Sequence, residues 1–441
     1  IKLLKSFPAE QIRNIDDAIR VCELEDGIAY ADLQKQAITS ALTEGMLVLT
    51  GGPGTGKTTT LNAIIKILQS RGKEVLLAAP TGRAAQRMSE VTGEKAKTIH
   101  RLLEVEWGDD DRQSFARNEH NPLIQDVVVV DELSMMDIQL FEALLRAMSA
   151  GCRLIMVGDT DQLPSVGAGN VLHDLIEAGV IPTVRLNRVF RQAQQSLIVT
   201  NAHAINRGEM PNLAVKDKDF FFLRRERDRD IAATVVDLCK NRLPRAYGNM
   251  ARNGLQVICA SRKGEAGTEN LNVLLQQALN PRERGKSEHS FRERIFREGD
   301  RVMQTRNNYD IGWVREYDGK EGNGIFNGDI GIIESIEVAE REMTVIFDDR
   351  RVVYDFSLLE DLEHAYAITV HKSQGSEYPM VVMPMCTASQ MLHTRNLFYT
   401  AVTRAQSMVI LVGREDIIKE MVENNRRSMR YTGLCHRLGG E

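Results

Sequence analysis

The sequence predicts an α/β protein made of two consecutive cores, each a parallel sheet wrapped by helices. Three observations predict this fold class. Short apolar, β-branched runs alternate with amphipathic stretches in both halves of the chain, which is typical of parallel strands joined by helices. A glycine-rich loop at residues 51–58 stands between a strand-like and a helix-like run and marks the first core. A strand-rich segment with turn signals at residues 300–360 predicts a small antiparallel barrel inserted in the second core.

The buried strands are predicted where apolar runs are short and uninterrupted. In the first core these runs are residues 46–49, 74–79, 127–131 and 154–158. A second series begins near Phe190, with strands predicted at residues 220–223, 257–260, 365–369, 380–383 and 408–412. The polar, acidic stretch at 103–122 interrupts the first core and predicts a small inserted hairpin, in which Trp107 is either a strand-separating tip or a packed side chain.

These patterns also predict how the chain is divided. We expect a helical lead-in at residues 1–30, a first core at 31–189, a second core at 190–430 and a tail at 431–441. Basic residues at 224–229 and 282–297 are mixed with acidic ones, and we expect both stretches to be mainly solvated surface. The chain begins with Ile1 rather than Met, which suggests a fragment whose upstream region is missing.

The composition describes a large globular protein without a strong charge signature. The 441 residues are 43% hydrophobic and 27% charged, and the net charge is −5, so any nucleic-acid partner has to be held by local Lys and Arg residues. The six cysteines are scattered and form no C-x-x-C pair, which predicts inert thiols in a reducing cytosol and no structural zinc. There is no signal peptide and no apolar run long enough to cross a bilayer, so we expect a cytoplasmic protein without a membrane partner.

The glycine-rich loop has the residue types that hold the phosphates of ATP. Glycines let backbone N–H groups curl around phosphate oxygens, Lys57 can reach the β- and γ-phosphates, and the hydroxyl of Thr58 is placed to bind Mg²⁺. The alternative is a glycine-rich turn with a capping threonine. The residues predicted to bind the nucleotide are Gly52, Pro53, Gly54, Thr55, Gly56, Lys57, Thr58 and Thr59.

Two carboxylates follow the third predicted strand. Asp131 and Glu132 end a run of four valines, and at the carboxyl end of a parallel strand they would face the phosphate loop. Asp131 is predicted to hold Mg²⁺ together with Thr58, and Glu132 to polarise the attacking water as the catalytic base. A solvated acidic pair is the alternative, and the phosphate loop upstream favours the metal site.

Two glutamines are candidates for contacts with the nucleotide. Gln162 follows the next strand, where an amide beside the γ-phosphate can sense whether that phosphate is present; an Asx-rich turn is the alternative. Gln34 lies upstream of the phosphate loop, and its amide can read the edge of adenine. An ordinary surface glutamine is the alternative there.

Together these segments resemble the motifs of superfamily 1B helicases, with the RecD-like branch as the best match. Motifs I, Ia, Ib, II and III correspond to residues 51–58, 79–85, 98–102, 131–135 and 158–169, and the resemblance extends from about Gln34 to Gly413. It implies two tandem RecA-like P-loop cores, with a hairpin that wedges the duplex in the first and an SH3-like β-barrel that closes over the strand in the second. It also implies an ATP- and Mg²⁺-dependent helicase that moves 5′ to 3′ along single-stranded DNA and unwinds duplex.

The resemblance suggests a role in bacterial DNA repair or recombination. Single-stranded DNA and duplex junctions are then the expected partners, together with DNA-repair proteins, and the expected state is a monomer. These expectations come from the family and not from the physics of any residue.

Two arginines in the second half belong to segments that resemble motifs IV and VI. These are Arg191 in residues 186–192 and Arg404 in residues 399–405. The family places both on the γ-phosphate, where a guanidinium stabilises the charge that develops on the transferring phosphoryl group. Taken singly, either arginine is more often a surface residue in a salt bridge.

Residues 367–377 resemble motif V of the same family. His371, Lys372 and Gln374 combine donors suited to phosphate with a tight turn, and we expect them to contact DNA. Glu377 is expected to accept a hydrogen bond from the nucleotide ribose.

Thr81, Arg83 and His100 follow predicted strand ends of the first core, and we expect them to contact DNA as well. A hydroxyl and a guanidinium can bind phosphates, and a histidine can stack on a base or donate a hydrogen bond to it. For His100 a satisfied structural histidine is the alternative.

Other functions remain open at this point. A single-strand translocase or an RNA-directed helicase without strong unwinding would keep the motor and change its output. A nucleotide-switched nucleic-acid clamp would use hydrolysis only to time release. A nuclease is not expected, because the sequence shows no cluster of carboxylates with metal spacing beyond Asp131 and Glu132.

Overall fold

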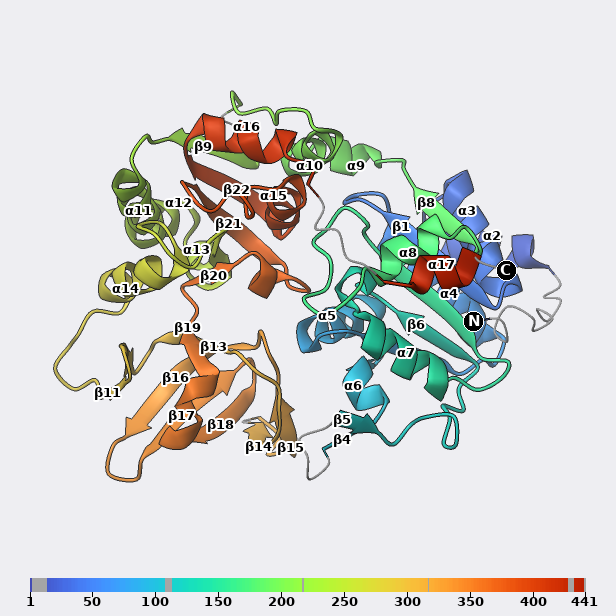
Figure 1. The fold of residues 1–441 in the computed structure, drawn as a ribbon, viewed down its shortest axis with the longest axis horizontal. Coiled ribbons are helices and arrows are strands. Elements are labelled where there is room, and N and C mark those ends of the chain that lie inside the picture. Colours follow the sequence, from blue (N-terminus) through green and yellow to red (C-terminus); the bar gives the residue numbers. More distant parts are fainter. Residues whose placement is uncertain (2–13, 108–112, 216–217, 316, 427–431, 440–441) are drawn as a thin grey trace. The chain divides into compact units, whose positions relative to one another are not determined.

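The computed structural model describes residues 1, 14–107, 113–215, 218–315, 317–426 and 432–439 (Figure 1). The chain divides into two compact units. The first contains Ile1–His203 together with Arg427–Glu441, and the second contains Ala204–Arg426. Each unit has its own sheet and its own hydrophobic core.

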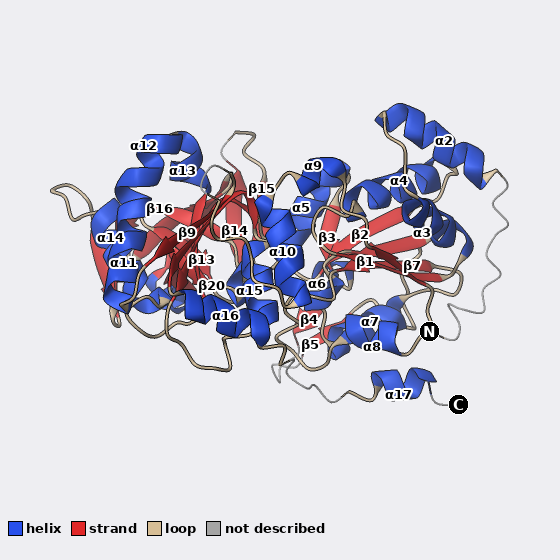
Figure 2. Cartoon of the chain, turned by 90° about the horizontal axis from the view of Figure 1, so that it is seen from above, coloured by secondary structure: helices blue, strands red, loops and turns tan. Residues whose placement is uncertain are grey.

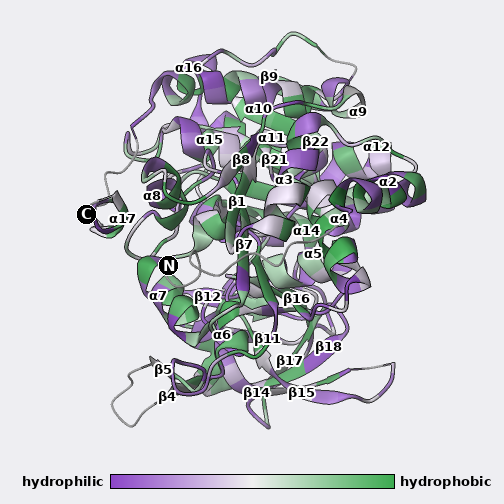
Figure 3. Cartoon of the chain, turned by 90° about the vertical axis from the view of Figure 1, so that its right-hand side faces the viewer, coloured by the Kyte–Doolittle hydropathy of each residue, from purple (hydrophilic) through white to green (hydrophobic). Residues whose placement is uncertain are grey.

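The first unit is built on a six-stranded sheet in the order β3-β2-β6-β7-β1-β8, and all its neighbouring strands are parallel. Every residue of β1 and β6 is buried, which explains why these strands are uninterrupted apolar runs in the sequence. Figure 3 shows β1 and β7 coloured mostly hydrophobic. The strands are β1 (Met46–Gly51), β2 (Val75–Ala79), β3 (Ala96–Thr98), β6 (Val127–Val130), β7 (Arg153–Gly158) and β8 (Thr183–Leu186).

Helices cover both faces of this sheet (Figure 2). One core cluster joins α2, α3 and α4 to one face, and a second cluster joins α6, α7 and α8 to the other. The short C-terminal helix α17 packs against α8 through Leu434 and Leu438. The helices with residues in this unit are α2 (Ile15–Asp26), α3 (Asp32–Thr43), α4 (Lys57–Ser70), α5 (Gly82–Thr92), α6 (Ile99–Leu102), α7 (Ile138–Ala147), α8 (Val171–Glu177), α9 (Arg191–Gln194), α10 (Leu197–Arg207) and α17 (Leu434–Gly439).

The expected hairpin in the first unit is present. It consists of β4 (Val105–Trp107) and β5 (Gln113–Phe115), which pair antiparallel with Val105 opposite Phe115. Residues 108–112 and the side chain of Trp107 lie outside the described part of the chain, so the expectation for Trp107 stays a prediction.

The second unit has a five-stranded parallel sheet in the order β20-β10-β21-β22-β9, and it contains all five strands expected from the sequence. These are β9 (Phe220–Arg224), β10 (Leu255–Cys259), β20 (Ala367–Thr369), β21 (Tyr378–Met385) and β22 (Ala405–Gly413). Its helices are α11 (Asp228–Asp237), α12 (Leu243–Tyr247), α13 (Asn249–Gly254), α14 (Thr268–Leu279), α15 (Arg395–Val402) and α16 (Glu415–Glu423), and a π-helical segment, Leu238–Arg242, joins α11 to α12.

The insertion in the second unit is a seven-stranded antiparallel sheet in the order β15-β14-β18-β17-β16-β13-β19. Its inward-facing residues, among them Val345 and Tyr354, form a core cluster of their own. Its strands are β13 (Arg301–Gln304), β14 (Asn308–Arg315), β15 (Glu321–Ile325), β16 (Ile330–Glu337), β17 (Glu342–Phe347), β18 (Arg350–Asp355) and β19 (Leu362–His364).

The expectation of a solvated surface at residues 282–297 is wrong for its last part. A hairpin of β11 (Glu288–Phe291) and β12 (Arg294–Arg297) forms there, and it buries Phe296 in the core of the insertion. Arg297 is also buried, with its Nε 2.5 Å from the Glu288 carboxylate. The mixed charges therefore include a buried ion pair, which composition alone does not distinguish from solvated charges.

A buried carboxylate joins the insertion to the second core. Asp300, just before β13, accepts hydrogen bonds from Asn280 at 2.8 Å, Gln276 at 2.5 Å and the hydroxyl of Tyr366 at 3.0 Å. His364 Nε2 lies 3.2 Å from the same carboxylate. Burial opposes the charged form, but the hydrogen bond and charge of His364 and the bonds from the two amides more than offset it, so the pKa of Asp300 lies below its usual value.

The cysteines agree with the expectation of inert thiols. All six are free, four of them are buried, and burial raises the pKa of Cys239 to about 12. Among the helices that the structure describes, none is long and apolar enough to cross a membrane.

Candidate nucleotide site and nucleic-acid contacts

The expected nucleotide-binding residues of the first unit gather at one edge of its sheet. The phosphate loop follows β1, Asp131 and Glu132 follow β6, and Gln162 lies shortly after β7. Because β7 lies between β6 and β1 and all three strands are parallel, their carboxyl ends share that edge. Open parallel sheets bind ligands at this edge.

Two glycines of the phosphate loop adopt a left-handed conformation that side chains rarely allow. Gly54 has φ 71° and Gly56 has φ 84°. A Cβ atom on Gly56 would also lie 2.7 Å from Nε2 of Gln34 and 2.9 Å from the ring of Phe190. The loop is closed internally by a hydrogen bond of 2.8 Å from the Thr55 hydroxyl to the carbonyl of Gly52.

Helix α4 begins at Lys57, directly after the loop. The Nζ atom of Lys57 donates hydrogen bonds to the carbonyls of Gly51 and Gly52, the latter at 3.1 Å, so it lies over the loop. Thr58 is exposed and Thr59 is half-buried. The loop thus presents a cation, an accessible hydroxyl and the first N–H groups of a helix together, which is an arrangement suited to phosphate.

Gln34 is buried beside the loop, so it is not a surface glutamine. Its Nε2 donates to the Thr60 hydroxyl at 3.1 Å, and its Oε1 accepts from the backbone N–H of Ala31 at 2.9 Å. These bonds fix which way the amide points and leave Oε1 one more lone pair. Gln34 and Phe190 line the same pocket, together with Ala31, Asp32, Leu33, Thr55, Leu186, Asn187 and Arg188.

The segment after β8 contacts the phosphate loop, which the sequence analysis did not anticipate. The backbone N–H of Phe190 donates to the carbonyl of Gly54 at 3.2 Å, and Nε2 of His203 on α10 lies 3.0 Å from the carbonyl oxygen of Pro53. Phe190 stands next to Arg191 in the segment 186–192 that resembles motif IV, so its aromatic side chain could have indicated a contact near the nucleotide. No local pattern marks His203. The side chain of Arg191 lies outside the described part of the chain.

Asp131 and Glu132 are arranged differently from a solvated pair. The Asp131 carboxylate accepts a hydrogen bond of 2.8 Å from the backbone N–H of Glu132. Burial, with the charge of Glu132 adding to it, raises the pKa of Asp131 to about 6. Glu132 has φ 52°, and Nη1 of Arg87 lies 3.8 Å from its Oε1.

Gln162 is buried, and its Oε1 atom has no hydrogen-bond partner among the described residues. Its Nε2 lies 3.5 Å from a carboxylate oxygen of Asp159, at the limit for a hydrogen bond. A buried amide oxygen without a partner is unfavourable by about 1 to 3 kcal/mol, so this atom is suited to accept a hydrogen bond from a bound water.

The residues at this edge fit a nucleotide with Mg²⁺. The hydroxyl of Thr58 and the carboxylate of Asp131 are the hard oxygen ligands that Mg²⁺ prefers. A carboxylate whose charge is destabilised by burial is stabilised by a divalent cation. The glycine conformations leave room for phosphate oxygens close to the backbone.

The expected DNA contacts of the first unit lie on α5 and α6. Thr81 caps α5, since its hydroxyl accepts from the N–H of Ala84 at 3.3 Å, and Arg83 is in the first turn. His100 lies on α6, where burial lowers its pKa although the charge of Asp137 opposes this, so its ring is neutral at neutral pH. Thr81 therefore has a structural role as a helix cap, and its contact with DNA stays a prediction.

In the second unit, Lys372 connects motif V to the insertion. Its Nζ donates to the side chain of Asn327 at 2.7 Å and lies 3.3 Å from the carbonyl of Thr305. Burial lowers the pKa of Lys372. His371, beside it, is exposed, and Gln374 is buried.

Arg404 is buried within the second unit. Its Nη1 donates to the carbonyl of Ser376 at 3.2 Å, and its Nε donates to the carbonyl of Thr400 at 3.3 Å. Glu377 is half-buried, and its carboxylate accepts from Nε2 of Gln406 at 3.3 Å. The guanidinium of Arg404 thus joins motif V to α15. Arg404 is therefore not the exposed salt-bridge residue that was the alternative interpretation.

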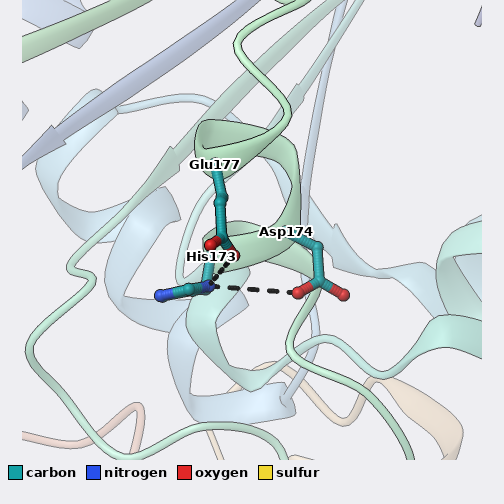
Figure 4. Close-up of side chains that lie close together, drawn as sticks. All are labelled: His173, Asp174 and Glu177. Carbon is teal, nitrogen blue, oxygen red and sulfur yellow. Dashed lines mark ion pairs between the residues drawn. The ribbon is translucent and has the colours of Figure 1, made fainter. Parts of the chain in front are cut away.

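Helix α8 carries a separate cluster of side chains of the types that bind metal ions, His173, Asp174 and Glu177, which the sequence analysis missed (Figure 4). His173 Nδ1 is 3.3 Å from the Glu177 carboxylate and 3.9 Å from that of Asp174. Asp174 also accepts a hydrogen bond from the hydroxyl of Thr432. We assign it no ligand, because these side chains already partner one another.

Three family descriptions match consecutive parts of the chain. Residues 34–168 match an AAA domain, residues 271–347 match an ATP-dependent RecD-like DNA helicase SH3 domain, and residues 364–412 match a UvrD-like helicase C-terminal domain. The SH3 match begins within α14 and covers the hairpin β11–β12, which the sequence analysis had placed outside the insertion.

Curated relatives match almost the whole chain. An ATP-dependent RecD2 DNA helicase from Deinococcus radiodurans is 37% identical over 99% of this chain, and the chain spans 56% of that relative. The RecBCD enzyme subunit RecD from Mycolicibacterium smegmatis is 32% identical over 99% of this chain, which spans 82% of it. The corresponding subunit from Mycobacterium tuberculosis is 33% identical, with 92% of this chain and 73% of that one covered.

Solved structures share the fold at low sequence identity. A Pif1 helicase from Bacteroides, in complex with ADP-AlF3 and ssDNA, has a TM-score of 0.52 at 19% identity. The match covers 89% of this chain and 94% of the Pif1 chain. The Pif1 helicase from Candida albicans has a TM-score of 0.52 at 18% identity, with 90% and 97% covered.

Proposed function

The chain belongs to the RecD family, and from this membership we propose that it is an ATP-dependent DNA helicase that moves 5′ to 3′ along single-stranded DNA and unwinds duplex. The chain spans little more than half of the Deinococcus relative, so the activity of the whole protein is part of this proposal. The direction of movement rests on the family relation.

The observation that carries the proposal is the shared sheet edge of the first unit. It places a phosphate loop, an acidic pair and a buried glutamine at the carboxyl ends of three adjacent parallel strands. A motor needs these parts in order to bind a triphosphate, activate a water and sense the loss of the γ-phosphate.

Each residue of this edge has a proposed role. Lys57 binds the β- and γ-phosphates, Thr58 and Asp131 hold Mg²⁺, and Glu132 orients the attacking water. The bound Mg²⁺ supplies positive charge that stabilises the phosphoryl group in the transition state. Gln162, whose Oε1 can accept a hydrogen bond from a water beside the γ-phosphate and whose Nε2 can donate one, is the proposed γ-phosphate sensor. Gln34 reads the adenine edge, and the backbone of Gly52, Pro53, Gly54, Thr55 and Gly56, with Thr59, surrounds the phosphates.

The residues expected from motifs IV to VI complete the proposal. Arg191 and Arg404 stabilise charge on the γ-phosphate, and Glu377 contacts the ribose. The proposed DNA contacts are Thr81, Arg83, His100, His371, Lys372 and Gln374. Of these, Lys372 would have to exchange its bonds to the insertion for a phosphate, which supports a coupling between strand binding and the insertion.

The remaining expectations belong to the same proposal. The sequence patterns support the domain bounds 31–189 and 190–430. The family supports the monomeric state, the cytoplasmic location and the repair-protein partners. The relatives named as RecBCD subunits work in an assembly, which makes a protein partner worth testing by co-purification.

The experiment that tests the function measures ATP hydrolysis and strand displacement in the same samples. The protein should hydrolyse ATP faster when single-stranded DNA is added, and it should displace the paired strand of a tailed duplex. Strand-stimulated hydrolysis without displacement would favour a translocase. Lys57→Ala should abolish hydrolysis, and hydrolysis that survived would mean that the nucleotide site is misplaced.

A further inference from the structure

An arginine on the helix that carries the proposed DNA contacts also holds the proposed catalytic base. Arg87 lies on α5, and its Nη1 is 3.8 Å from Oε1 of Glu132. Arg87 follows Arg83 by four residues, so the two guanidinium groups leave the helix on the same face. One face of α5 therefore carries both Arg83, near the helix start that Thr81 caps, and Arg87, which contacts the proposed catalytic base Glu132.

This ion pair opposes the task proposed for Glu132. A carboxylate that orients an attacking water needs its lone pairs directed at that water. A guanidinium within ion-pair distance attracts the same oxygen and holds it toward Arg87. The side chain of Glu132 is only 12% exposed, so solvent screens the pair less than it would on an open surface.

The position of Arg87 also lets a nucleic-acid phosphate compete for it. The Arg87 side chain is 37% exposed, and a phosphate offers a full negative charge with oxygens that match the guanidinium fork. A strand that binds at the start of α5, where Thr81 and Arg83 lie, brings such phosphates one helical turn from Arg87.

We propose that Arg87 is a positioning residue that restrains Glu132, and that a phosphate of single-stranded DNA bound along α5 draws Arg87 away and frees Glu132 to orient the attacking water. The inference rests on the proposed function, since it assigns to that function a means of stimulation by the strand. The expected effect is modest, because partly exposed ion pairs shift an equilibrium by about two- to five-fold.

Three variants test the proposal. Arg87→Ala removes the restraint, and Arg87→Lys keeps a charge that can still reach Glu132. Gln86→Ala is the matched control, because Gln86 is an exposed neighbour on α5 whose amide bonds Glu90 at 3.2 Å. ATP hydrolysis is measured for each without DNA and with saturating oligo(dT), and thermal melting confirms that each is folded. Arg87→Gln replaces Arg87→Ala if the alanine variant melts early.

We expect Arg87→Ala to hydrolyse ATP about two- to five-fold faster than the wild type without DNA and at the same rate with saturating DNA. Its stimulation by DNA then falls by the same factor, while Arg87→Lys and Gln86→Ala behave like the wild type. The proposal is overturned if Arg87→Ala hydrolyses ATP at an unchanged or lower rate without DNA, or if its rate with saturating DNA rises by the same factor as its rate without DNA. It is also overturned if Arg87→Lys hydrolyses ATP without DNA as fast as Arg87→Ala. A wild type without stimulation by DNA would instead contradict the proposed function itself.

Discussion

The Nε2 atom of His203 lies 3.0 Å from the carbonyl oxygen of Pro53, so helix α10 contacts the phosphate loop directly. Helices α9 and α10 also come close to Gly54, where an added Cβ atom would lie only 2.7 Å from Ala193 and 3.2 Å from Val199. Helix α10 begins in the first unit and ends at Arg207 in the second. The contact between His203 and Pro53 therefore lies within the first unit, close to its boundary with the second.

His203→Ala is predicted to weaken ATP binding. Loss of one hydrogen bond to the loop should raise the KM for ATP about three- to ten-fold and leave kcat within about two-fold. His203→Gln keeps a donor at a similar position and should restore most of the affinity. Steady-state ATPase assays of both variants measure this, and an unchanged KM in His203→Ala would show that the contact does not support the loop.

Gln34→Ala is predicted to reduce both the affinity for ATP and the preference for adenine. The amide is held by Thr60 and Ala31 in one orientation, so its loss removes one hydrogen bond that Oε1 accepts from the base and raises the KM for ATP about three- to ten-fold. Gln36→Ala is the control, since Gln36 is exposed on the same helix. Equal KM values for ATP and GTP in the wild type would contradict adenine recognition by Gln34.

The parallel sheets were predictable because buried strands must be short apolar runs, and the strand-end rule then placed Asp131, Glu132 and Gln162 at one edge. The contacts of Arg87, His203 and Asp300 were not predictable. Each joins residues that are distant in sequence, and neither a helical nor a strand period encodes such a pair. Thr81 shows a different limit, because a residue suited to phosphate is equally suited to cap a helix.

Asp300→Asn is predicted to destabilise the second unit. Its carboxylate, which is not exposed to solvent, accepts from Asn280, Gln276, Tyr366 and the backbone N–H of Arg297, with His364 beside it, so the substitution should lower the free energy of unfolding by about 2 to 4 kcal/mol at pH 7. Asp310→Asn, at an exposed position of the insertion, should have no such effect. Urea unfolding followed by circular dichroism measures both, and equal stabilities would mean that the network contributes nothing.

The same variant has a predicted pH dependence. The pKa of folded Asp300 lies below its usual value, so its stabilisation is fully present above about pH 4 and is lost as the pH falls through the folded pKa. The difference in free energy of unfolding between wild type and Asp300→Asn should therefore narrow as the pH falls below about pH 4. A difference that widened in acid would contradict the sign of this shift.

Arg404→Ala is predicted to affect hydrolysis more than nucleotide binding. If Arg404 stabilises charge on the γ-phosphate, kcat should fall about 10³-fold while a fluorescent ATP analogue still binds. The variant should also melt earlier, because the carbonyls of Ser376 and Thr400 lose a buried donor. Earlier melting with kcat reduced less than about ten-fold would assign Arg404 a structural role alone.

The most direct test of the central claim compares two duplexes that differ only in the polarity of a single-stranded tail. Each is incubated with the protein and ATP, and ATP hydrolysis and strand displacement are recorded in the same samples, with Lys57→Ala as the inactive control. The account predicts that the duplex with a 5′ tail is unwound and the duplex with a 3′ tail is left intact, whereas Lys57→Ala hydrolyses no ATP and unwinds neither duplex. Unwinding of the 3′-tailed duplex instead would contradict a 5′ to 3′ motor of the RecD family.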